Sequence, residues 1–229
     1  FHLFFFFYRI KKKFFKHKIF NLFFNNIVVD EIGLTHFNKK ILNLKFKKNL
    51  YLMGYFQSEK YFFKNKKDII DDLFPKRPKE KRYHTLKEKI ILNNSVAICV
   101  RMYEELLNPS KLGGISNADY YNKSINLIKG NKKLNYFLFS TKKSNLEKII
   151  NQIPKLKRAQ QLKRVFMITS DRGYDNPMDN LWLLSYFKKI VISNSSLYWW
   201  GVYFAKIRYK KIQYFISKNF SNKDSLKIR

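Results

Sequence analysis

The sequence predicts an α/β protein whose carboxy-terminal part contains a parallel, doubly wound sheet. Three observations predict it. Apolar runs of strand length alternate with segments of helical spacing, the run at 96–100 is apolar throughout, and 45% of the 229 residues are hydrophobic, enough for a sizeable core. A continuous apolar run is typical of a strand covered on both faces. Strands that alternate with helices are typical of a parallel sheet.

The regular pattern begins at Ser95, and its elements follow one another along the chain. Helices are expected where apolar residues recur every three or four positions. The second of them is expected to end before Pro154. The predicted strands are 96–100, 135–140, 164–169 and 190–193, and the predicted helices are 117–128, 145–153, 179–187 and 197–205.

The first 90 residues are less regular, because short aromatic and aliphatic runs are separated by stretches of Lys and Asn. The segment FPKRPKEKR at 74–82 carries two prolines and a run of charges, which is typical of a linker. We therefore predict a partial amino-terminal domain at 1–90, a Rossmann-like domain at 91–215 and a basic tail at 216–229.

The formal net charge of +31 suggests a polyanionic partner such as nucleic acid or an anionic membrane surface. Lys outnumbers Arg and accompanies abundant Asn, Ile and Phe, so a general compositional bias explains the charge as well. The lysines are spread along the chain without a recognition motif, and we therefore expect no nucleic-acid partner. The Phe-rich, Lys-rich opening fits either peripheral contact with an anionic membrane or a buried element followed by a basic turn.

A single cysteine, Cys99, precludes an intramolecular disulfide and favours a reducing compartment. The four histidines are scattered without the spacing of metal ligands, so no metal is expected. No apolar run approaches the roughly 20 residues of a membrane-spanning helix. We therefore expect a cytoplasmic protein, either soluble or peripheral to the inner membrane.

Polar residues with a preference for anions follow three of the predicted strands. Arg101 follows the first, Ser140 ends the second, and the triplet at 194–196, Asn194, Ser195 and Ser196, follows the fourth. Doubly wound sheets bind ligands beyond the carboxyl ends of their strands. A guanidinium matches a phosphate with two hydrogen bonds, and a helix start offers free amides to an anion. The alternatives are an ion pair of Arg101 with Glu104 or Glu105, and ordinary helix capping at the triplet.

Two longer blocks are specific enough to indicate a family. They are GYFQSEKYF at 54–62 and NSSLYWWG at 194–201, and weaker blocks surround Arg101, 119–121, 139–141 and 179–185. In order and spacing, from about residue 45 to about residue 205, the set resembles the α-1,2-fucosyltransferases of glycosyltransferase family 11.

The resemblance implies an inverting, GT-B-like enzyme that transfers L-fucose from GDP-L-fucose to a galactose hydroxyl of a surface glycan, such as lipopolysaccharide. No divalent metal is implied. The carboxy-terminal domain would bind the donor, and the amino-terminal one would face the acceptor. Arg101 would neutralise the diphosphate, Glu104 would stand at an acidic catalytic position, and Ser140, Asn194, Ser195 and Ser196 would contact the nucleotide.

The chain departs from the family pattern at several positions. The usual His-x-Arg-x-Gly-Asp-Tyr reads Cys-Val-Arg-Met-Tyr-Glu-Glu at 99–105, so Tyr103 replaces a glycine and Glu104 is one methylene longer. In the family pattern an aspartate follows the second strand, whereas this chain has Lys142 and Lys143 there. The glycine-rich amino-terminal signature is absent, and we expect the chain to lack the start of that domain. A degenerate relative that binds a nucleotide or glycan without transfer is therefore the second hypothesis.

Overall fold

The computed structural model describes residues 27–30, 36–45, 50–53, 56, 58–105, 107–108, 114–130 and 133–219. The chain divides into two compact units, Phe1–Phe56 and Gln57–Arg229. In the first unit, strands β1 (Ile27–Asp30) and β2 (Leu50–Met53) pair in parallel, with helix α3 (Lys39–Leu42) between them in the sequence. The Phe-rich opening of the chain lies outside the described residues.

The described residues of the second unit contain a five-stranded sheet in which every neighbouring pair is parallel. The strand order is β5-β4-β3-β6-β7, so the chain adds strands on one side of β3 and then on the other. This is the predicted α/β, Rossmann-like architecture. The strands are β3 (Ser95–Cys99), β4 (Asn135–Ser140), β5 (Val165–Thr169), β6 (Lys189–Ile192) and β7 (Gln213–Ile216).

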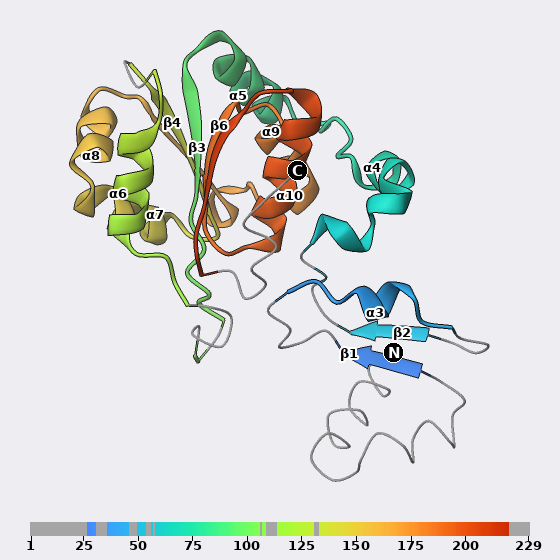
Figure 1. Cartoon of the computed structure of the whole chain (residues 1–229). Coiled ribbons are helices and arrows are strands. Elements are labelled where there is room, and N and C mark those ends of the chain that lie inside the picture. The colour runs from blue at the N-terminus through green and yellow to red at the C-terminus, as the bar shows by residue number, and fades with distance from the viewer. Residues whose placement is uncertain are drawn as a thin grey trace. The chain divides into compact units, whose positions relative to one another are not determined.

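Helices cover both faces of this sheet (Figure 1). One face packs against α6 (Ala118–Leu127), α7 (Lys143–Gln152) and α8 (Pro154–Gln161), and the other against α5 (Lys81–Leu92), α9 (Pro177–Leu184) and α10 (Ser196–Arg208). Shorter elements are η1 (Glu59–Tyr61), η2 (Phe63–Asn65) and α4 (Lys66–Leu73) before α5, and η4 (Ser170–Arg172) after β5.

The position of strand β3 at the centre of the sheet explains why the run at 96–100 is apolar throughout. Ala97 and Cys99 belong to the core on the side of α5, α9 and α10, whereas Val96 and Ile98 belong to the core on the opposite side. All four side chains are fully buried. Alternate residues of a strand point to opposite faces, so a central strand with two covered faces has no position for a polar residue.

Several elements were not predicted from the sequence, and three of them bear on the boundaries expected above. Helix α8 begins at Pro154, where the predicted helix was expected to end, because proline is well suited to a first helical turn whose amide needs no partner. Strand β7 ends at Ile216, the first residue assigned to the basic tail. Helix α5 occupies the expected junction, and the two compact units divide at Phe56 and Gln57 instead.

In the part of the chain that the structure describes, no helix combines the length and apolar character needed to cross a bilayer.

Candidate functional site

The predicted site residues gather at the carboxyl edge of the sheet. Arg101 lies two residues after β3, Ser140 is the last residue of β4, and Asn194 lies two residues after β6. Backbone bonds hold the three strand ends together: the amide of Ser193 donates to Cys99 O at 3.1 Å, and the amide of Val100 donates to Phe139 O at 2.8 Å. The strand order reverses between β3 and β6, which is where doubly wound sheets bind ligands.

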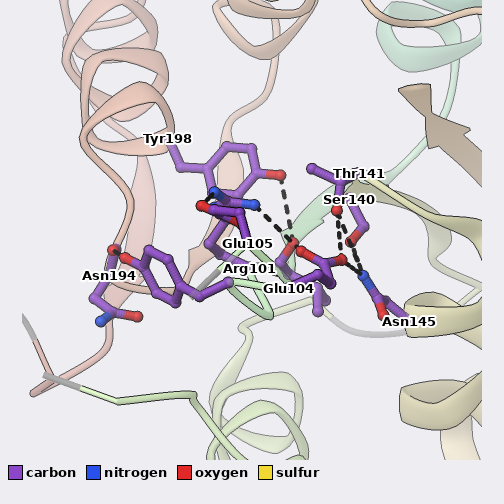
Figure 2. Close-up of polar contacts among 10 residues, drawn as sticks. Arg101, Glu104, Glu105, Ser140, Thr141, Asn145, Asn194 and Tyr198 are labelled. Carbon is purple, nitrogen blue, oxygen red and sulfur yellow. Dashed lines mark hydrogen bonds and ion pairs between the residues drawn. The ribbon is translucent and has the colours of Figure 1, made fainter. Parts of the chain in front are cut away.

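Arg101 is engaged by acidic side chains of its own loop (Figure 2). Its Nη1 donates to Glu104 Oε2 at 3.4 Å, and its Nη2 pairs with Glu105 Oε1. The other oxygen of Glu104 accepts from Thr141 Oγ1 at 2.7 Å and from Asn145 Nδ2. This polar network joins the loop after β3 to the end of β4 and the first turn of α7. The ion-pair alternative raised for Arg101 is therefore present in the structure.

The same network sets the protonation state of Glu104. Partial burial would raise the pKa of this carboxyl, but the bonds from Thr141 and Asn145 and the charge of Arg101 outweigh it and lower the pKa. Glu104 is therefore ionised at neutral pH and holds no proton to donate. Its geometry suits fixing the position of Arg101 rather than acting as an acid.

Tyr103 lies against Arg101 and reaches from the loop after β3 to the turn after β6. Its ring centroid is 4.8 Å from the Arg101 guanidinium carbon, and its hydroxyl donates to the backbone oxygen of Asn194. The residue is 7% exposed and has a positive φ of 52°. One side chain thus contacts both the cation after β3 and the turn that precedes α10.

The amino terminus of α10 faces this loop. Ser195 is the N-cap residue, and within the described structure its side chain makes no capping hydrogen bond; Ser196, the next residue, is exposed. Asn194 is 4% exposed, and its Nδ2 donates to Gly114 O at 2.9 Å. Asn194 therefore organises neighbouring backbone, whereas the two serines and the first amides of α10 are the part placed to meet an anion.

Helix α7 begins at the same edge but is capped differently. The amide of Lys143 donates to both carboxylate oxygens of Asp171, at 3.1 and 2.9 Å. Ser140, which precedes α7, is 6% exposed and accepts from Asn145 at 3.4 Å. An internal carboxylate therefore occupies the start of α7, and Ser140 is enclosed beneath it.

The structure brings Arg101, Glu104 and the triplet at 194–196, which the sequence predicted, to one edge of the sheet. Three further residues there were not predicted: Tyr103, Asn145 and Tyr198, whose hydroxyl donates to Val100 O at 3.4 Å. Tyr103 carried a signal, since it stands at a position where the family pattern has glycine. Asn145 carried none, because an asparagine in the first turn of a helix is ordinary.

Metal ligands do not gather in the described residues, where no group of three or more His, Cys, Asp or Glu side chains could hold an ion. The Arg101 guanidinium and the start of α10 both contribute positive charge at this edge.

Comparison with known proteins identifies the family of the chain. The profile described as "Glycosyl transferase family 11" matches residues 5–227. An α-1,2-colitosyltransferase of Escherichia coli is 28% identical over 170 residues, which are 73% of this chain and 55% of that protein. The chain thus spans about half the length of this relative. No solved structure matches the chain. Because the family profile covers nearly all of the sequence, including every strand of the sheet, the chain belongs to glycosyltransferase family 11.

Proposed function

We propose that this chain carries the donor site of an inverting α-1,2-glycosyltransferase. The donor is a GDP-linked deoxy sugar, with GDP-L-fucose the first candidate, and the acceptor is a galactose hydroxyl of a surface glycan. One observation carries the proposal. Arg101 and the start of α10, whose N-cap side chain does not cap it, lie together at the switch point of the sheet, joined by Tyr103.

The charge changes of the reaction fit this arrangement. As the acceptor oxygen forms a bond to the anomeric carbon, the bond from that carbon to the diphosphate breaks, and both bonding electrons leave with GDP. Negative charge grows on the leaving group while the sugar ring becomes positive. A guanidinium and helix amides stabilise the departing diphosphate, so we propose that transfer needs no metal.

Glu104 has a supporting part in this proposal. It is ionised and held by Thr141 and Asn145, and it fixes one edge of the Arg101 guanidinium. Its lowered pKa makes Glu104 a weak base, so we propose that the proton of the acceptor hydroxyl passes to solvent water. An oxocarbenium-like transition state lessens the need for a strong base at that oxygen.

The donor sugar can be identified by comparing two GDP-sugars, GDP-L-fucose and GDP-colitose. The similar E. coli protein is an α-1,2-colitosyltransferase, and colitose is L-fucose without its 3-hydroxyl group. We therefore place GDP-colitose second to GDP-L-fucose. The two sugars present the same leaving group to Arg101, so the choice between them depends on contacts with the sugar ring.

The test is a transfer assay with purified protein and a panel of β-galactosides. We expect product from GDP-L-fucose or GDP-colitose, none from UDP-galactose, and no loss of activity in EDTA. Thermal stabilisation by GDP without any transfer would identify a degenerate, non-catalytic relative. Strict dependence on added Mn²⁺ would contradict the metal-free mechanism.

We further propose that the protein works at the cytoplasmic face of the inner membrane, in peripheral contact with anionic lipid. The net charge of +31 supports this location. Sedimentation with vesicles of phosphatidylglycerol at low salt, and release at 0.5 M NaCl, would test it; equal sedimentation with neutral vesicles would contradict it.

A further inference from the structure

We infer that Tyr103 is the positioning residue that holds Arg101 in register with the start of α10, so that both meet one diphosphate. The inference rests on the proposed donor site and extends it. Tyr103 lies beside the proposed donor site and acts through the Arg101 guanidinium.

Two contacts on opposite ends of the side chain carry the inference. The aromatic ring lies 4.8 Å from the Arg101 guanidinium carbon, which is within the range of cation–π attraction. The hydroxyl donates to Asn194 O, one residue before the N-cap of α10. A rigid ring therefore spans the two strands between which the switch point lies.

The backbone of Tyr103 gives independent support. Its φ of 52° is in the left-handed region, which a bulky residue rarely adopts and glycine adopts freely. Such a conformation costs energy and persists only where surrounding contacts determine it. If the Tyr103 side chain only filled space, nothing would offset the cost of this backbone conformation. Its two specific contacts, with the Arg101 guanidinium and with Asn194 O, explain why the conformation is kept.

Positioning matters here because arginine is long and flexible. Ion pairs with Glu104 and Glu105 restrain the edges of the Arg101 guanidinium, but no hydrogen bond or ion pair described for either glutamate reaches α10. The Tyr198 hydroxyl of α10 bonds Val100 O at the start of this loop, and Tyr103 links the guanidinium itself to the turn that precedes the helix. With it, the guanidinium and the amides of α10 are set at a fixed separation before the donor arrives, which reduces the entropy lost on binding.

GDP titration of the purified chain by calorimetry tests the inference. We expect Tyr103→Leu to raise the GDP Kd roughly tenfold, in line with loss of a partly desolvated cation–π contact. Tyr103→Phe keeps the ring contact with Arg101 but loses the bond to Asn194 O, so its GDP Kd should lie between those of wild type and Tyr103→Leu. In an Arg101→Ala background, Tyr103→Leu should cause no further loss, because the two residues act as one unit.

The matched control is Tyr121→Phe. Tyr121 is fully buried on α6, and its hydroxyl donates to Cys99 O at 3.4 Å without a described contact to Arg101. It should lower the unfolding temperature as Tyr103→Phe does and leave the GDP Kd unchanged. If Tyr103→Leu does not fold, Tyr103→Gly replaces it, because glycine accepts the positive φ.

The outcomes separate the two proposals. Wild-type affinity in Tyr103→Leu, or an equal loss with and without Arg101, would overturn the positioning role while the donor site stands. If the wild-type chain binds no GDP, the proposed function fails and this inference falls with it.

Discussion

Two helices begin at the same edge of the sheet, and their first turns differ. At α7 the first amide, that of Lys143, donates to both carboxylate oxygens of Asp171. At α10 the N-cap residue Ser195 makes no capping bond in the described structure, and Arg101 stands on the neighbouring loop. Both helix starts carry the same partial positive charge. The protein supplies its own anion to α7 and a second cation to the vicinity of α10.

This difference shows that a parallel sheet alone does not define a binding site. The fold places several helix amino termini along one edge, and side chains decide which of them is available to a ligand. Asp171 stabilises α7 and removes it as an anion site. This contrast supports the proposal that a diphosphate binds at the start of α10, with the loop of Arg101 beside it.

The largest expected effect is that of Arg101→Ala. Loss of the guanidinium leaves the diphosphate poorly neutralised in the transition state, and we expect transfer to fall by roughly 10²- to 10³-fold. Lys142→Ala is the matched control, since Lys142 is an exposed cation at the N-cap of α7. Steady-state kinetics with the preferred GDP-sugar measures both. Equal losses in the two variants would erase the distinction between the helices.

Ser195→Asp makes the start of α10 resemble that of α7. A carboxylate at the N-cap should bind the first amides and repel the diphosphate. We expect the GDP Kd to rise roughly tenfold while stability increases by about 0.3–1 kcal/mol. The expected result is weaker GDP binding by calorimetry together with greater stability in urea unfolding. Lower stability together with weaker binding would indicate simple disruption of the turn.

Much of the carboxy-terminal fold was predictable because its signals are local. The apolar run at 96–100 and the alternating helical segments reflect burial on two faces, which the sequence records directly. Helix α8 and strand β7 escaped prediction for physical reasons. Pro154 fits a helix start as well as a helix end, and β7 is a short edge strand whose residues are only half-buried.

The site was predictable only as a set of strand ends. Parallel strands bring Arg101 and the triplet at 194–196 together whatever their distance in sequence. The contacts that tune them depend on side-chain directions: Glu104 is held by Asn145, 41 residues away, and Tyr103 reaches Asn194, 91 residues away. No spacing rule reports such pairs, because they arise only after the strands have paired.

Asp171→Asn tests the start of α7, where an internal carboxylate binds the first amide of the helix. Bonds from Thr169 and from the Lys143 amide lower the pKa of Asp171 below its ordinary 3.8. Its charge therefore stabilises the fold above about pH 4, and this contribution disappears as pH falls through the lowered pKa. We expect a melting temperature lower by a few degrees at pH 7, little difference between variant and wild type near pH 2, and unchanged GDP affinity. A weaker GDP affinity in this variant would implicate α7 in donor binding.

The smallest expected effect belongs to Glu105→Gln. Glu105 pairs with Arg101 while its own side chain is 53% exposed, so the ion pair is weak and competes with a diphosphate for the same guanidinium. Removing that charge should lower the GDP Kd roughly twofold to fivefold, most clearly at low salt. Glu147→Gln is the control, because Glu147 makes a similarly exposed pair with Lys143 in α7 and should leave the GDP Kd unchanged. Weaker binding in Glu105→Gln would mean that the restraint of Arg101 by this carboxylate outweighs its competition with the diphosphate, contrary to the expectation here.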